Sequence, residues 1–187
     1  MSKRAQSSPR YQRELKWAEE FEGHFADESW NWILSYGSER YRAADAYIDA
    51  LDRKADDLIR YISASIAILA GALSIFAKRG DGPIVLGFTI ALGAAFIGLC
   101  FAAAARNPRN MKIPPSVRFL MDWFQHTKDD APKVKQRVAA SIHVAHTGLI
   151  EIADNKSHRL GIASLCLAMS LFAFLATLAL VVIITWN

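Results

Sequence analysis

Charged residues are missing from three long stretches of the chain, and this pattern dominates the sequence. No Asp, Glu, Lys or Arg occurs in residues 61–77, 82–105 or 160–187. A helix rises about 1.5 Å per residue, so each stretch is near or above the roughly 17–25 residues that cross about 30 Å of hydrocarbon. The pattern therefore predicts an all-α integral membrane protein with three transmembrane helices and a cytoplasmic helical bundle or stalk.

Helical periodicity continues from the polar part of the chain into the first and last apolar stretches. Apolar residues separated by three and four positions form a heptad seam before each one, which is typical of packed helices. The first seam contains Tyr41, Ala44, Ile48, Leu51, Ala55 and Leu58, and the second contains Val138, Ile142, Ala145, Leu149 and Ile152. We expect residues 37–77 to form a stalk helix continuous with the first span, and the second seam to run into the third span.

The ends of the remaining segments are predicted from residues that commonly start or stop helices. Ser8-Pro9 is a helix start signal, and Gly37-Ser38 is a break, so residues 1–36 are expected to hold an amphipathic, Trp-rich cytoplasmic helix. The second span covers 83–105, and Asn107-Pro108 ends it. Residues 106–159 form a cytoplasmic helical region, with a short helix starting at Ser116, and residues 160–186 form the third span.

The distribution of charge adds a prediction of how the chain is oriented in the membrane. The net charge is +4, but residues 1–60 carry 10 basic and 12 acidic residues, whereas residues 106–159 carry 10 and 5. Lys and Arg near the ends of the spans set topology, and they gather before span one, after span two and before span three. We therefore expect a multi-pass protein of the inner (plasma) membrane with a cytoplasmic N-terminus and an external C-terminus.

The sequence offers little chemistry for an enzyme or a pump. The interiors of the spans contain no Asp, Glu, Lys, Arg or His, which argues against proton-coupled transporters, because these usually need such a group at depth. No nucleophile elbow, phosphate-binding glycine loop or metalloprotease helix is present. Asp154 and His158 lie four apart on a helix, but two ligands do not make a metal site. We expect a non-enzymatic protein with no metal and no cofactor.

Small residues line two of the spans. They allow helix backbones to approach closely and favour packing between transmembrane helices. In span two they are Gly87, Ala91, Ala94, Ala95, Gly98 and Ala102, and in span one they are Ser63, Ala67, Ala70, Gly71 and Ser74. Two arrangements are open: a hairpin packed within one subunit, or an oligomer in which the stripes pack between subunits.

A weak internal repeat precedes spans one and three. Residues 48–58 and 150–160 both read Ile, acid, two residues, Asp, any residue, Lys, small, two residues, Leu, which aligns Asp52 with Asp154 and Lys54 with Lys156. The two segments are expected at equal depth on the same side. A basic cluster, Arg106, Arg109 and Lys112, follows span two. Lipid headgroup contact is one interpretation of this cluster, and an anionic ligand such as a nucleotide is the other.

The segment Leu51-Asp52-Arg53-Lys54-Ala55, which enters span one, resembles the Pycsar transmembrane effectors of bacterial anti-phage signalling and, more loosely, the SLATT membrane effectors. The shared order continues through a tight hairpin, the Pro108-Arg109 pair and the Lys156 that precedes the last span. The resemblance covers about residues 40–180. It implies a membrane protein that responds to a cyclic nucleotide and impairs the host membrane during infection.

Two functions from different classes are consistent with the sequence. The first is an oligomerising effector that impairs membrane integrity, with the lipid bilayer and further copies of the chain as partners, a cyclic nucleotide as ligand and no nucleic acid polymer. The second is a membrane anchor or scaffold subunit that recruits a soluble partner through its N-terminal helix.

Overall fold

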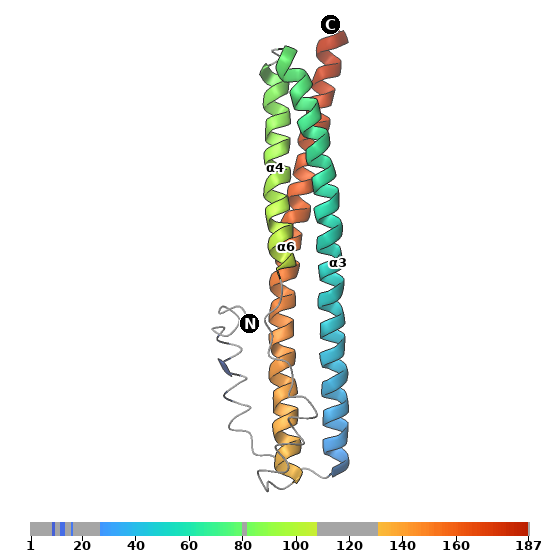
Figure 1. Ribbon diagram of the computed structural model, residues 1–187, viewed down its shortest axis with the longest axis vertical. Helices are drawn as coiled ribbons and strands as arrows, with labels where there is room; N and C mark the ends of the chain where they lie inside the picture. Colours follow the sequence, from blue (N-terminus) through green and yellow to red (C-terminus); the bar gives the residue numbers. More distant parts are fainter. Residues whose placement is uncertain are drawn as a thin grey trace. The chain divides into compact units, whose positions relative to one another are not determined.

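A computed structural model describes residues 9, 12, 13, 16, 27–79, 82–107 and 131–186. Three long helices account for almost all of them: α3 (Asp27–Arg79), α4 (Gly82–Arg106) and α6 (Ala131–Trp186). Figure 1 shows each as one uninterrupted ribbon. The all-α class is confirmed, and so is the prediction that the stalk seams run without a break into the first and third apolar stretches.

The predicted break at Gly37-Ser38 is wrong, because α3 begins at Asp27 and continues through both residues. The Ser38 hydroxyl donates to the carbonyl of Ser35 at 2.8 Å, so its polar group is satisfied within the helix. A Cβ added at Gly37 would lie 3.2 Å from Cγ2 of Ile142 on α6. Close helix packing therefore accounts for this glycine. The predicted helix of 116–124, and most of residues 1–26, lie outside the described residues.

The chain divides into two compact units: residues 1–50 with 108–154, and residues 51–107 with 155–187. In the second unit, α3 and α4 are antiparallel, because residue 56 contacts residue 106 and residue 76 contacts residue 88. Residues 91 and 104 of α4 contact 170 and 159 of α6, so this pair is antiparallel too. The second unit is therefore an up-down-up bundle of three helices.

The core of the second unit is a set of heptad seams. The buried residues of each helix recur at spacings of three, four or seven, as in coiled-coil packing. They are Leu51, Ala55, Leu58, Ile62 and Leu69 on α3; Ile84, Phe88, Ala91, Ala95, Gly98, Ala102 and Ala105 on α4; and Lys156, Leu160, Ala163, Ser170 and Thr177 on α6. Phe88 stacks on Phe76, with ring centroids 5.4 Å apart, and also meets Phe174.

All three helices are long and apolar enough to cross a membrane. Their most apolar windows have mean hydropathies of 1.8, 2.4 and 2.8 for α3, α4 and α6. Only 11%, 28% and 11% of these windows is buried within the protein. Large apolar side chains, including Ile68, Phe96 and Phe172, remain exposed. Apolar surface of this extent is costly in water and is satisfied by lipid.

The first unit packs the N-terminal part of α3 with the N-terminal part of α6. Trp30 and Ile48 of α3 and Leu149 of α6 are fully or almost fully buried, and Val134 is buried as well. Of the predicted seams, Ile48 and Leu149 are buried, whereas Tyr41, Ala44, Val138, Ile142 and Ala145 are half-buried. On α6, residues outside the predicted seam, such as Val144 and Thr147, are also buried, so the seam does not define the buried face of that helix alone.

Candidate functional site

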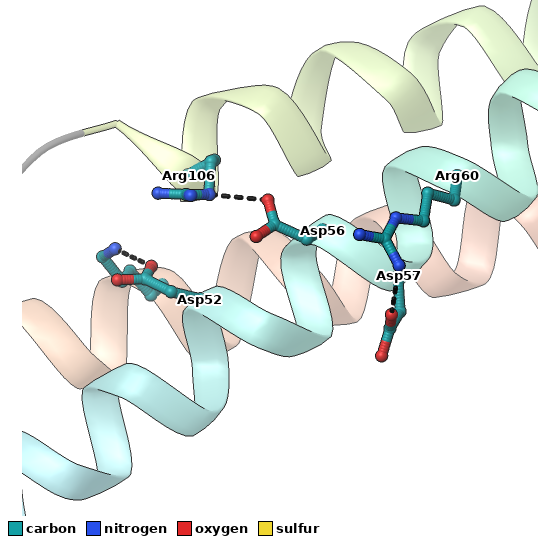
Figure 2. A network of polar contacts seen from close by, with 6 residues as sticks. Asp52, Asp56, Asp57, Arg60 and Arg106 are labelled. Atoms are coloured by element: carbon teal, nitrogen blue, oxygen red, sulfur yellow. Dashed lines mark hydrogen bonds and ion pairs between the residues drawn. The ribbon is translucent and has the colours of Figure 1, made fainter.

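Charged side chains from all three helices gather at one end of the second unit. We name Asp52, Asp56, Arg106, Lys156 and Arg159 the polar cluster. Asp52 and Asp56 lie one turn apart on α3, and Figure 2 shows them directed toward different partners. The apolar stretches of all three helices begin or end next to this cluster. It therefore lies at the boundary between the apolar and polar parts of the bundle.

Lys156 is the most buried member of the polar cluster. It belongs to the buried seam of α6, and only 8% of its side chain is exposed. Its ammonium group donates a hydrogen bond to the carboxylate of Asp52, whose side chain is 21% exposed. A buried ammonium group is tolerated only when it is paired, because desolvation of a lone charge costs several kcal/mol. The pair therefore links α6 to α3 at one defined position.

The other contacts of the polar cluster hold the C-terminal end of α4. Arg106 Nε donates to Oδ1 of Asp56 at 2.6 Å, with side chains 52% and 40% exposed. Arg159 donates from Nη1 to the carbonyl oxygen of Ala104 at 2.7 Å. That carbonyl is one of the last four of α4, which have no partner within the helix. Basic side chains are also favoured at this negative end of a helix.

The structure brings some of the sequence-predicted residues together and separates others. Asp52 and Lys156 form an ion pair, whereas Lys54 and Asp154 are exposed. The repeat predicted that Asp52 and Asp154 lie at the same depth. The structure instead places Lys156 beside Asp52, a shift of two residues, or about 3 Å of helix rise, along α6. Of the predicted basic cluster, Arg106 is paired with Asp56, and Arg109 and Lys112 lie outside the described residues.

Sequence reasoning missed the role of Asp56, although a signal for it existed. Asp56 and Arg106 are equally distant in sequence from Asp81, which lies in the connection between α3 and α4. In an antiparallel helical hairpin, positions equally distant from the turn lie opposite each other. A search for opposite charges placed symmetrically about Asp81 in the sequence would have found this pair.

The small residues of α4 pack against α6. A Cβ at Gly87 would lie 3.0 Å from Cγ2 and 3.2 Å from Cβ of Thr177. A Cβ at Gly98 would lie 3.1 Å from Cβ of Cys166 and 3.3 Å from the carbonyl oxygen of Ala163. Between them, Ser170 donates a 2.8 Å hydrogen bond to the carbonyl of Ala91. Gly87, Ala91 and Gly98 therefore form an internal contact, and their partner is the third span.

The small residues of α3 face outward from the bundle instead of packing within it. Ser63, Ala67, Ala70, Gly71 and Ser74 are all exposed. A Cβ at Gly71 would meet no heavy atom within 4 Å. The hydroxyl of Ser74 donates to the carbonyl of Gly71 at 2.8 Å, so it needs no partner from another helix. Gly71 is therefore not a packing residue within one copy of the described bundle.

The first unit carries an exposed aromatic stack that the sequence did not reveal. Trp32 and Tyr36 lie 5.2 Å apart with rings 4° from parallel, and Arg40 lies 5.6 Å over the Tyr36 ring. Arg40 also donates to the Tyr36 hydroxyl at 2.9 Å. Burial lowers the pKa of His146 below its usual range, and Arg40 and His143 lower it further.

The contacts of the polar cluster join helices to one another. Its members pair with one another or with a helix end, and they include no nucleophile beside a general base. Among the described residues, no group of three or more His, Cys, Asp or Glu side chains is placed to hold a metal ion. Comparisons with protein-family models, with curated proteins and with solved structures gave no match for this chain.

Proposed function

We propose that this protein is a non-enzymatic membrane effector that associates with further copies of itself and impairs the integrity of the bacterial inner membrane in anti-phage signalling. In this proposal the N-terminus is cytoplasmic and the C-terminus external, as the distribution of Lys and Arg favours. The resemblance to Pycsar-type transmembrane effectors supports the assignment. The structural observation that carries it is the outward location of the small residues of α3.

Small residues on an outer face allow a second helix to approach the α3 backbone closely. Association in a bilayer depends on such packing, because lipid removes the hydrophobic driving force between helices. Gly71 lies in open space, and the exposed Ile68 and Ile75 flank it at heptad spacing. The equivalent face of α4, by contrast, is already used within the bundle. The α3 face is thus a small-residue surface that remains available for another copy.

A cyclic nucleotide is the proposed signal, by analogy with the same effectors. Arg106 is the described member of the predicted anion-binding cluster, and half of its side chain is exposed to solvent. Its guanidinium group is engaged by Asp56, so an anionic ligand must compete with that carboxylate. We expect such a ligand to weaken the contact between α3 and α4 at this end of the bundle.

The test compares two glycines that each accept a side chain without a clash. Gly71 on α3 and Gly93 on α4 are both exposed, and a Cβ at either meets nothing within 4 Å. We expect Gly71→Ile to reduce crosslinked oligomers and to reduce depolarisation, measured with a voltage-sensitive dye during induced expression. Gly93→Ile should leave both at the wild-type level. The absence of depolarisation by the wild-type protein, with and without cyclic nucleotides, would refute the effector function.

A membrane anchor or scaffold is the second proposal, and the aromatic stack of the first unit favours it. Trp, Tyr and Arg are the residues most enriched in the energetic centres of protein interfaces. Trp32 is 67% exposed and Tyr36 45% exposed, yet their rings are already ordered by stacking. Such preorganisation reduces the entropy lost on binding. The partner would be a soluble protein with a complementary apolar and acidic surface.

Substitution of the stack separates the two functions. We expect Trp32→Ala/Tyr36→Ala to remove a stoichiometric partner from complexes purified in mild detergent while membrane insertion is unchanged. Tyr47→Ala is the matched control, because Tyr47 is 52% exposed on the same helix. For an effector without a scaffold role, the double variant should depolarise the membrane as the wild type does, and both proteins should be purified without a partner.

A further inference from the structure

Lys156 occupies a position that an apolar residue would normally fill. It lies four residues before Leu160 and seven before Ala163, and both of these are buried in the core of the bundle. A single charged residue in such a seam costs stability but selects one register of the helices. Its partner Asp52 follows the buried Leu51 on α3. The pair therefore fixes how far α6 lies along α3 in the second unit.

A second carboxylate is available to Lys156 one turn farther along α3. Asp56 lies four residues after Asp52, which corresponds to about 6 Å of helix rise. Figure 2 shows Asp56 beside Arg106, and the Asp56 carboxylate is engaged in the ion pair with Arg106. A displacement of α6 by one helical turn would bring Lys156 to the level of Asp56. One-turn displacements between packed helices are a known form of two-state transition.

The contact between α4 and α6 has room for such a displacement at Gly87, and the shift would break the Ser170–Ala91 and Arg159–Ala104 hydrogen bonds and separate Phe88 from Phe174. Much of the inner face of α4 is made of small residues: Gly87, Ala91, Ala95, Gly98 and Ala102. On α6, residues one and two turns before Thr177 are also small on this face, with Ala173 half-buried and Ser170 buried. After a shift of one turn, Ala173 would meet Gly87 in place of Thr177. The smaller side chain fits the same space.

We propose that the polar cluster is a two-position latch. In the first position Lys156 binds Asp52 and Arg106 holds Asp56. In the second position Arg106 has released Asp56, and Lys156 binds it after α6 has moved by one turn. Arg106 thus keeps the second position closed. The latch deepens the effector proposal by naming its conformational change, but the two can be tested separately.

Disulfide crosslinking can report each position by itself. The background is Cys100→Ala/Cys166→Ala, in which Cys166→Ala keeps the Cβ that contacts Gly98. The first reporter is Gly87→Cys/Thr177→Cys, since a Cβ at Gly87 lies 3.2 Å from that of Thr177, close to the roughly 3.5–4.5 Å of disulfides. The second reporter is Gly87→Cys/Ala173→Cys/Thr177→Ala, in which Thr177→Ala removes the Cγ2 and hydroxyl groups that a new side chain at 87 would overlap. Membranes are oxidised with copper phenanthroline, and thiols that remain are counted by maleimide gel shift.

With the latch intact, we expect the first reporter to crosslink efficiently and the second to crosslink poorly. Arg106→Gln should raise the yield of the second reporter several-fold and lower that of the first. Adding Asp56→Asn to Arg106→Gln should reverse this change, because Lys156 then has no second carboxylate. Asp52→Asn added to Arg106→Gln should raise the yield of the second reporter further, because Lys156 then has a carboxylate only in the second position.

Three results would overturn the latch. The first is that Arg106→Gln leaves both yields unchanged. The second is that Asp56→Asn fails to reverse its effect. The third is that both crosslinks are lost in Arg106→Gln and are not regained with Asp56→Asn, which would indicate a disrupted bundle. Crosslinking does not depend on membrane damage, so the latch can fail while the wild-type protein still depolarises cells, and the reverse is equally distinguishable.

Discussion

The stripes of small residues on α3 and α4 look alike in the sequence, but the α3 stripe faces outward and the α4 stripe faces α6. On α4 they face α6, and the large side chains Leu86, Ile90 and Phe96 are exposed. On α3 the large residues Leu58, Ile62 and Leu69 are buried, and the small ones are exposed. In a bilayer a large apolar residue is satisfied on either side of a helix. Whether a stripe of small residues faces inward or outward is therefore decided by the fit between neighbouring helices. The stripe alone does not reveal that fit.

The largest expected difference between the two stripes of small residues appears when the same side chain is placed on both. We expect Gly87→Val to destabilise the bundle by about 2 kcal/mol, because the new side chain overlaps the buried Thr177 and cores lose roughly 1–3 kcal/mol when overpacked. Gly71→Val should change the free energy of unfolding by less than about 0.5 kcal/mol, as expected of an exposed site. Reversible unfolding in mixed detergent micelles measures both.

A second substitution checks that the clash itself is responsible. Thr177→Ala removes Cγ2 and the hydroxyl, and it leaves a Cβ 3.2 Å from that of a new residue at 87. Gly87→Ala/Thr177→Ala should therefore be more stable than Gly87→Ala alone. If Gly87→Val and Gly71→Val prove equally destabilising, α4 does not pack on α6 through this stripe.

A smaller effect distinguishes two glycines of α4 itself. Gly98→Ala must displace Cβ of Cys166 or the backbone of α6, and we expect it to cost about 1 kcal/mol. Gly93 is exposed with open space around it, so Gly93→Ala should stabilise the helix by roughly 0.4–1 kcal/mol through the lower entropy of the unfolded chain. The two variants should thus differ in sign in the same unfolding assay, and a shared sign would contradict the described face of α4.

The absence of charge over long stretches was enough to predict the three apolar helices, both ends of α4 and the C-terminal ends of α3 and α6, but it did not give the starts of α3 and α6. It predicted α4 as 83–105, and the structure has Gly82–Arg106. The heptads also gave the inner face of α3. Gly37 misled the prediction, because a glycine that breaks an isolated helix also serves where another helix comes close, and only the position of Ile142 distinguishes the two. Asp52 and Lys156 were selected as members of two aligned repeats, matched with Asp154 and Lys54, and their pairing with each other needed the parallel arrangement of α3 and α6.

The smallest expected effect on stability concerns two serines, one on α6 and one on α3. Ser170 donates to the carbonyl of Ala91 on another helix, whereas Ser74 donates to Gly71 on its own helix. Interhelical hydrogen bonds in membranes contribute about 0.6 kcal/mol on average, because the separated helices find other partners in the bilayer. We therefore expect Ser170→Ala to lower the free energy of unfolding by about that amount and Ser74→Ala to leave it unchanged. Parallel unfolding curves of the two variants resolve the difference, and equal losses would mean that the buried hydroxyl of α6 does not contribute to its contact with α4.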